Sequence, residues 1–334
     1  MRAYVLRKIG LLAGTLFGAS LVVFLGLRVI PGDPAQMMAG EMGTAGDVQR
    51  LRQELGLNQP VYVQYARFLA ESARGNFGRS LRAEYPVTHV IGDVFPATVE
   101  LGVTSLALAC AIGWSAGTLA AIKHNTGVDS ALTVLVLFGV SMPSFWVGIL
   151  LILTFALQLG VFPAGGALSL SVPLHRVTGM YVVDSLIQGN WPALKDALMH
   201  LALPALTLAL YPAGIIARMT RSAMLEVLRQ DYITTARSKG LSERTVVLRH
   251  ALRNSLIPVV TVVGLQLGYL ISGAVVVEAV FARPGMGRLA VTSILFRDYP
   301  VVQGIVAYAV VAFVLVNLLV DVTYAYLDPR IAYT

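Results

Sequence analysis

The sequence predicts an all-α polytopic membrane protein with about six transmembrane helices. Its 334 residues are 56% hydrophobic and 13% charged, about half the charged fraction of an average soluble domain. No Asp, Glu, Lys or Arg occurs between residues 130 and 174. Six apolar stretches reach or approach the roughly 20 residues that a helix needs to cross a bilayer. They are Ile9–Ile30, Leu101–Ile122, Ala131–Leu159, Leu201–Ala217, Ser255–Val277 and Val301–Val320.

Three of these stretches need separate comment. Ile9–Ile30 is longer than the 7–15-residue core of a secretory signal, and no cleavage site follows, so we expect an uncleaved first span. In Ala131–Leu159, Pro143 predicts a kink. Leu201–Ala217 is the shortest and contains two prolines, so a re-entrant or interfacial segment is an alternative. Glycines four residues apart, such as Gly113 and Gly117, predict close helix packing within the chain.

The distribution of basic residues predicts the orientation of the chain. Arg2, Arg7 and Lys8 precede the first stretch, and eight Lys or Arg residues lie between residues 218 and 254. Basic residues concentrate on the cytoplasmic side of membrane proteins. We therefore expect both termini to be cytoplasmic.

The first external loop, residues 31–100, is long enough to carry its own structure. Asp47 is a plausible N-cap for a helix through Leu55, with Gly56 as its stop. A second helix is expected from Val61 to Arg74, ended by a glycine. We divide the chain into residues 1–100, a first transmembrane helix (about 9–30) plus this extracytoplasmic loop, and residues 101–334, a core of about five transmembrane helices with a cytoplasmic loop at 218–254.

The cytoplasmic loop contains a predicted helical elbow. Asp231 can cap a short helix through Lys239, and Gly240 can adopt the left-handed conformation that stops it. Ser242 then caps a second helix through about Leu252. A rigid basic elbow tethered to two membrane spans can be gripped and moved by a cytoplasmic partner.

The run Tyr232–Ser242 resembles the "EAA" coupling loop of ABC importer permeases. Residues 234–236, Thr-Thr-Ala, stand where Glu-Ala-Ala is usual, and Gly240 matches the glycine of that loop. The following run His250–Asn254 reads H-A-L-R-N, which is similar to the dipeptide/oligopeptide/nickel branch of the family.

Motifs elsewhere in the chain extend this resemblance over nearly its whole length, and the long loop after the first span is similar to the B-type permease of the branch. The matching segments are Pro31–Pro34, Leu55–Leu57, Gln64–Tyr65, Gly78–Ser80, Pro96–Leu101, Ser141–Trp146, Glu278–Phe281 and Pro284–Gly287.

The resemblance implies a type I permease fold and a subunit of an ATP-driven importer of di- or oligopeptides in the bacterial inner membrane. The implied partners are a sister permease, two ATPase subunits that bind ATP and Mg, an extracytoplasmic substrate-binding protein and membrane lipid. Relatives also carry glutathione and nickel complexes, so these substrates stay open. The residues expected to contact the ATPase are Thr234, Thr235, Ala236, Lys239, Gly240, Leu241, Ser242 and Arg244.

The residues themselves argue against enzymatic chemistry in this chain. There is no G-x-x-x-x-G-K-[ST] loop, no H-E-x-x-H and no convincing nucleophile–base pair, and the five histidines are scattered. The only cysteine, Cys110, lies in an apolar run, so no metal site is expected. Thr235–Leu248 has helix-turn-helix spacing, but a loop between two spans offers no free domain for nucleic acid. The basic residues of this loop can also bind anionic lipid headgroups, and such binding is compatible with a role of the loop in coupling to an ATPase.

An ion-gradient-driven carrier of small solutes is the main alternative. Such carriers place ionisable groups deep in their spans, whereas these spans are nearly free of charge. Glu278, just beyond the fifth stretch, is expected either to pair with Arg283 or Arg288, or to meet a peptide ammonium group at the outer gate. Candidate path residues, for which helix–helix hydrogen bonding is an equal alternative, are Gln266, Tyr269, Ser272, Glu278 and Asn317.

Overall fold

The structure, a computed structural model, describes residues 14, 17–22, 24–26, 28, 33–39, 43–54 and 56–327, without the side chains of residues 34, 37, 38, 54, 257, 267–269, 271–273, 314 and 316–327. Within these residues the regular structure is helical and no strand occurs, which confirms the all-α prediction. Half of the first apolar stretch, Ile9–Ile30, lies outside them.

The chain forms two compact units. Unit 1 comprises residues 1–96, 285–315 and 332–334, and unit 2 comprises residues 97–284 and 316–331. The predicted division at residue 100 follows the order of spans and loops and stays a prediction.

Unit 1 contains short helices around a small apolar core. Val87 and Ile91 pack there with Val301 and Ile305, and Asp298 accepts a buried hydrogen bond from the Ser80 hydroxyl. Its helices are α2 (Pro34–Ala39), α3 (Ala45–Glu54), α4 (Val61–Ala73), α5 (Val87–Gly92), α14 (Met286–Leu295) and the start of α15 (Tyr299–Leu327).

The two helices predicted in the external loop are confirmed as α3 and α4, but the predicted N-cap is wrong. Thr44 precedes α3, and its hydroxyl accepts a hydrogen bond from the Asp47 backbone N–H. The Asp47 carboxylate in turn accepts from the Thr44 backbone N–H at 3.0 Å. This reciprocal pair is a capping box, in which the acidic residue occupies the third helical position.

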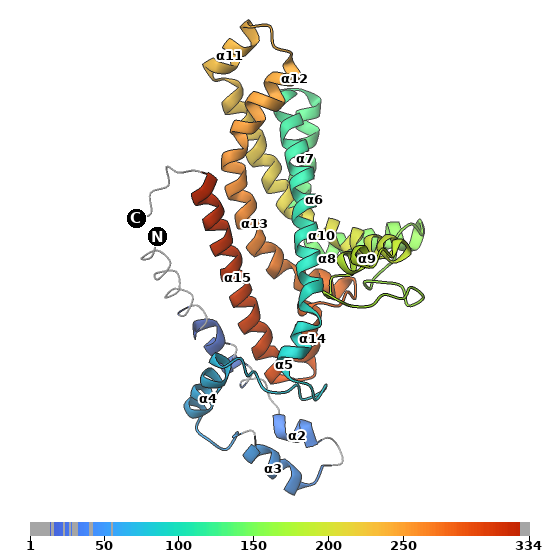
Figure 1. Ribbon diagram of the computed structural model, residues 1–334, viewed down its shortest axis with the longest axis vertical. Coiled ribbons are helices and arrows are strands. Elements are labelled where there is room, and N and C mark those ends of the chain that lie inside the picture. The colour runs from blue at the N-terminus through green and yellow to red at the C-terminus, as the bar shows by residue number, and fades with distance from the viewer. Residues whose placement is uncertain are drawn as a thin grey trace. The chain divides into compact units, whose positions relative to one another are not determined.

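Unit 2 is a bundle in which α6, α10 and α13 lie side by side (Figure 1). Small side chains of α6 and α10, among them Ala109, Ala209 and Ala213, form part of its core. Its helices are α6 (Phe95–Ile122), α7 (Gly127–Ser141), α8 (Ser144–Leu151), the π-helix η1 (Ile152–Gln158), α9 (Tyr181–Ile187), α10 (Trp191–Leu228), α11 (Asp231–Ser238), α12 (Glu243–Thr245), the π-helix η2 (Val246–Ala251) and α13 (Leu252–Val280).

Gly113 and Gly117 bring α6 against α10. A Cβ at Gly113 would lie 2.6 Å from the Ile216 side chain, and one at Gly117 would overlap the Ala217 carbonyl oxygen. The predicted role of this glycine spacing, packing within the chain, is confirmed at these two positions.

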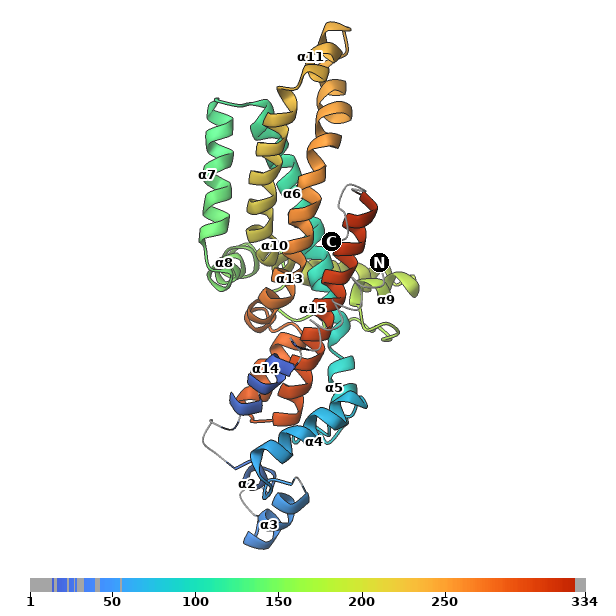
Figure 2. The same ribbon diagram turned by 90° about the vertical axis from the view of Figure 1, so that its left-hand side faces the viewer.

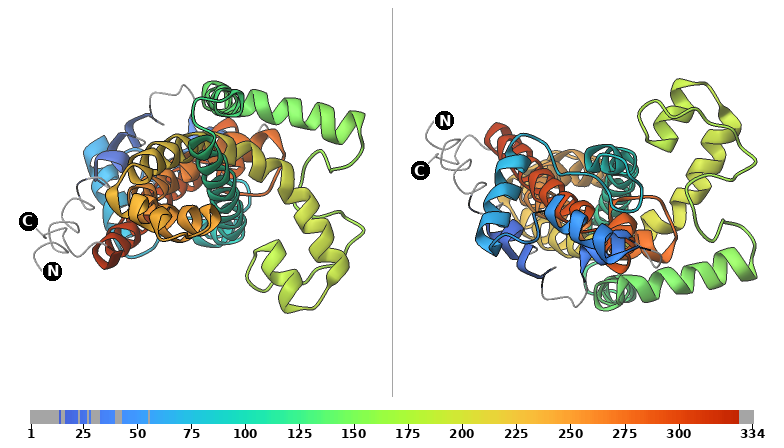
Figure 3. Two further views of the ribbon diagram at one scale, coloured as in Figure 1. Left: turned by 90° about the horizontal axis from the view of Figure 1, so that it is seen from above. Right: turned by 90° about the horizontal axis from the view of Figure 1, so that it is seen from below.

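The third apolar stretch is sharply bent. The helix pair 127–141 and 144–158 turns by 107° at Met142–Pro143, so the expected kink is a near right angle. At about 1.5 Å per residue, the 15 residues of α7 reach about 22 Å, less than the roughly 30 Å hydrocarbon thickness. The segment from α8 to the start of α10 projects sideways from the bundle (Figure 3).

The fourth stretch lies inside one 38-residue helix, α10, which continues through Pro204 and Pro212. The re-entrant alternative for it is therefore wrong. By length and composition, the described residues contain two unbroken helices able to cross a membrane, within 87–122 and 191–228, and up to four if each of two bent pairs is one span. The sixth stretch lies in α15.

Candidate functional site

The elbow lies at one end of unit 2, where α10 leads into α11 and α12 leads into α13 (Figure 2). Helix α11 ends at Ser238; Gly240, two residues later, has φ +78°, and its N–H donates to the Arg237 carbonyl at 2.9 Å. The predicted left-handed stop is confirmed. The predicted cap at Asp231 is wrong, because Gln230 occupies the N-cap position without a side-chain bond and Asp231 is the first helical residue.

Side-chain bonds hold the turn between α11 and α12. The Ser242 hydroxyl accepts the Thr245 N–H at 3.4 Å, so Ser242 is the N-cap as predicted. Arg237 forms a 2.7 Å ion pair with Glu243 across the turn. Hydrogen bonding from Arg237 lowers the pKa of Glu243 below its ordinary value.

The second arm of the elbow is continuous with a membrane helix. Helix α12 passes through η2 directly into α13, so the predicted separate helix ending near Leu252 is wrong. The axis bends by 56° between residues 243–256 and 258–266, where Pro258 lacks the N–H that would continue the helical ladder. The elbow and α13 are therefore joined by continuous helical backbone that bends near Pro258.

An apolar contact supports the elbow from beneath. Ile233 and Ala236 of α11 are buried against Val246, Val247 and Met224. Of the eight predicted coupling residues, Ala236 is thus buried and faces inward, whereas the other seven are exposed: Thr234, Thr235, Lys239, Gly240, Leu241, Ser242 and Arg244.

Several exposed side chains of the elbow were not predicted as coupling residues, among them two large ones, Tyr232 and Leu248. Tyr232 is 41% exposed, and its hydroxyl accepts a hydrogen bond from Asn254 at 2.8 Å. Leu248 is 49% exposed. The amphipathic pattern of α11, with Ile233 and Ala236 on one face, was the signal that could have placed Tyr232 on the other.

The structure does not bring the predicted path residues together as one site. Gln266 is buried, and its side-chain oxygen has no hydrogen-bond partner within the described part of the chain. Glu278 is fully buried, and its carboxylate accepts a 2.7 Å hydrogen bond from Thr98. The side chains of Tyr269, Ser272 and Asn317 lie outside the described residues.

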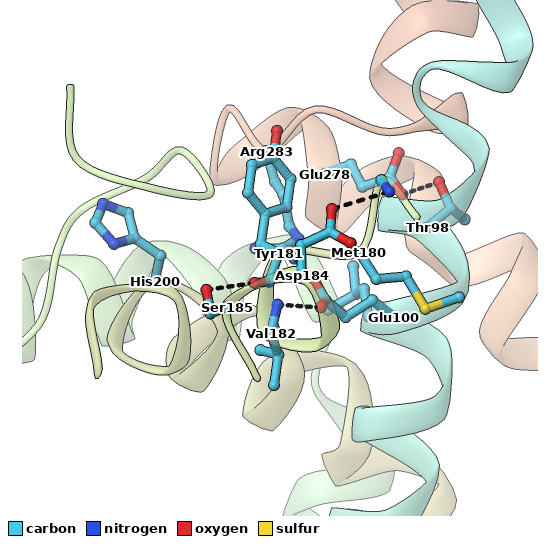
Figure 4. A network of polar contacts seen from close by, with 12 residues as sticks. Thr98, Glu100, Met180, Tyr181, Val182, Asp184, Ser185, His200, Glu278 and Arg283 are labelled. Carbon is cyan, nitrogen blue, oxygen red and sulfur yellow. Dashed lines mark hydrogen bonds and ion pairs between the residues drawn. The ribbon is translucent and has the colours of Figure 1, made fainter. Parts of the chain in front are cut away.

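A buried polar cluster lies in unit 2 where α6 begins and α13 ends (Figure 4). Arg283 forms a 2.6 Å ion pair with Glu100. Glu100 also accepts the Val182 N–H at 2.7 Å, and Glu278 interacts electrostatically with Arg283. The cluster joins α6, the start of α9 and the turn after α13. Glu100 was missed because its partner is 183 residues away in the sequence.

Two further carboxylates of unit 2 hold neighbouring segments together. Asp184 accepts hydrogen bonds from three consecutive backbone N–H groups, those of residues 177–179. Burial alone would raise its pKa, but the hydrogen bonds from Thr178 and its neighbours lower it below the ordinary value. Asp129 accepts two 2.7 Å hydrogen bonds from Arg221, which tie α7 to α10 near the elbow.

Unit 2 is thus a helical bundle of mostly apolar helices that carries a helical elbow at one end. The family described as "Binding-protein-dependent transport system inner membrane component" matches residues 113–333, and its N-terminal counterpart matches residues 1–102. The chain belongs to this family. It is a multi-pass inner-membrane permease subunit of an ABC importer and not an enzyme.

Several curated proteins are similar over nearly the whole chain. The dipeptide transport system permease protein DppB of Alkalihalophilus pseudofirmus is 43% identical over 100% of both chains. The probable D,D-dipeptide transport system permease protein DdpB of Escherichia coli is 46% identical over 94% of this chain and 93% of its own. The glutathione transport system permease protein GsiC of Escherichia coli is 40% identical over 100% of both chains.

A solved structure, described as an amino acid ABC transporter with histidines, has the same fold. It matches with a TM-score of 0.50 at 14% sequence identity, covering 72% of this chain and 94% of the other.

Proposed function

We propose that this chain forms half of the translocation path of an ATP-driven importer of di- and oligopeptides. The single observation that carries the coupling part is the unbroken run from α12 through η2 into α13, next to the glycine-stopped helix α11. The names of the DppB and DdpB relatives support peptides as the substrate class, and that of GsiC keeps glutathione, itself a modified peptide, as a second candidate.

The proposed assembly comprises a sister permease, two ATPase subunits and an extracytoplasmic substrate-binding protein, with both termini of this chain in the cytosol. ATP and Mg are bound by the ATPase subunits. The ATPase contacts the exposed residues of the elbow, and Ala236 acts from beneath by packing α11 against η2. Closure of the ATPase on ATP then pulls α13, and the path opens on the outer side.

Gly240→Val tests the elbow. A β-branched residue disfavours positive φ, so this variant deforms the turn, whereas Gly240→Asn is tolerated because Asn adopts the left-handed conformation more readily. With all partners reconstituted in vesicles, we expect ATP-dependent accumulation of a labelled dipeptide to fall at least tenfold in Gly240→Val and to persist in Gly240→Asn. The amount of inserted protein should be equal in both.

The rival mechanism is tested with the chain alone. Vesicles that contain only this protein, with a proton or sodium gradient and no ATP, should not accumulate the dipeptide. Accumulation there would identify a gradient-driven carrier and would overturn the proposed coupling.

A further inference from the structure

A hollow of about 900 Å³ lies within unit 1, lined mainly by α4, the turn that follows it and the start of α15. Its apolar lining includes Phe68 of α4 together with Phe77 and Leu81 from the following turn. Its polar lining includes side chains of both charge signs. Binding pockets commonly combine an apolar lining with a few polar groups that fix the ligand's orientation.

Most charged groups of this hollow are already engaged. Arg28 donates to Gln64 and lies over the Phe24 ring. Arg52 and Asp33 form an ion pair at 2.8 Å. These groups form part of the wall of the hollow, and their hydrogen bonds and ion pair leave them little capacity to bind a ligand.

Arg67 and Glu71 differ, because they retain free hydrogen-bonding capacity. Within the described part of the chain, Arg67 makes no hydrogen bond or ion pair, and its guanidinium lies beside Gly56 at the hollow. Glu71 accepts one hydrogen bond, from Asn76 at 2.7 Å, and its other oxygen forms a long ion pair with the exposed Arg74 at 3.9 Å. The hollow therefore offers a free cation and a carboxylate oxygen that is held only by one long, solvent-exposed ion pair, which contributes little.

The spacing of these two groups suits a short zwitterion. Residues four apart on a helix share a face, with Cβ atoms about 5–6 Å apart, and Arg67 and Glu71 stand in this relation on α4. An extended dipeptide spans at most about 7 Å. One charged terminus can thus meet each side chain.

We propose that this hollow is a docking site for zwitterionic dipeptides. The peptide carboxylate lies at Arg67, its ammonium group lies at Glu71, and its side chains pack on Phe68, Phe77 and Leu81. An anionic lipid would use Arg67 and leave Glu71 without a role, so the paired charges favour the peptide. The inference rests on the proposed peptide substrate and adds a binding site to it.

The test uses the full chain without partners in phosphatidylcholine nanodiscs, with binding of the dipeptide Ala-Leu measured by equilibrium dialysis. Wild-type protein should bind Ala-Leu about fivefold more tightly than its C-terminal amide or its N-acetyl derivative, the upper end for an exposed ion pair. Arg67→Gln should abolish only the preference for Ala-Leu over its amide. Glu71→Gln should abolish only the preference for Ala-Leu over its N-acetyl derivative. Arg50→Gln, an exposed arginine outside the hollow, should keep both.

The proposed docking site would be refuted if the wild-type protein bound all three compounds equally. It would also be refuted if Arg67→Gln kept the preference over the amide or Glu71→Gln kept the preference over the N-acetyl derivative. Failure of the site is distinguishable from failure of the proposed function. ATP-driven uptake by the assembled importer without selective binding by this chain refutes the docking site alone, whereas selective binding without ATP-driven uptake refutes the proposed transport mechanism alone.

Discussion

Glu100 and Arg283 form an ion pair whose side chains are 5% and 1% exposed. Burying such charges is costly, and their attraction offsets this only with good geometry and further hydrogen bonds. Glu100 has such a bond from Val182, whereas the Nε and Nη1 atoms of Arg283 are buried without a hydrogen-bond partner among the described residues. We therefore expect the protein to lose more stability when one partner of this pair is removed than when both are replaced together.

At the residue scale, we predict that Arg283→Met lowers the free energy of unfolding by about 3–5 kcal/mol, because it leaves the Glu100 carboxylate buried without its counter-charge. The double variant Glu100→Gln/Arg283→Met should lose less than the sum of the two single variants. Denaturant titration of the purified protein in mixed micelles measures these differences. Arg229→Met, at an exposed position, is the matched control, and strictly additive losses would contradict a coupled pair.

At the element scale, the close contact between α6 and α10 depends on glycines of α6, which have no side chain to keep the two helices apart. Alanine is favoured over glycine by roughly 0.5–1 kcal/mol within a helix, so intrinsic propensity alone predicts that Gly→Ala stabilises α6. At Gly117 the added methyl group would overlap the Ala217 carbonyl, whereas at Gly102 the new Cβ would meet no atom within 4 Å among the described residues, apart from its chain neighbours and the nearby backbone of its own helix.

We therefore predict opposite outcomes for two identical substitutions in one helix. Gly117→Ala should destabilise the protein by about 1–3 kcal/mol through overpacking, and Gly102→Ala should be neutral or stabilising. The two variants are compared by heating each protein to a series of temperatures and measuring, by size-exclusion chromatography, the fraction that stays folded. A loss of the same size in both would show that the α6–α10 contact does not depend on close approach at Gly117.

At the scale of the whole molecule, the elbow is expected to be covered by a partner. Leu241 at its tip is 41% exposed, and the native Cys110 is buried. In a Cys110→Ala background, a thiol at Leu241→Cys should react with a maleimide in the isolated chain. Assembly with the ATPase subunits should slow that labelling at least fivefold.

Gln49→Cys serves as the reference in the same experiment. Gln49 is exposed on α3 in unit 1, remote in sequence from the elbow, and in detergent its labelling should not respond to the ATPase. Equal labelling of Leu241→Cys with and without the ATPase would contradict a docked elbow.

Local features of this protein were largely predictable from its sequence. The apolar stretches mark the helices, Gly240 and Ser242 mark the elbow, and Gly56 marks the end of α3. Each of these signals acts within a few residues, because helix caps and left-handed stops satisfy backbone groups in the adjacent turn. The wrong caps, Asp47 and Asp231, are acidic residues inside a first helical turn, where composition alone resembles a cap.

The sequence by itself determined that the chain is a helical membrane protein with a helical elbow, because hydrophobicity and helix capping depend on residues close together in the chain. Only the tertiary structure decided that Glu100 meets Arg283, that the elbow continues into α13, that the third stretch turns by 107° and that α4 shares a hollow with the start of α15. The two charges are 183 residues apart, and α4 lies far from α15 in the sequence. Packing brings such segments together, and no local pattern records which of them will meet.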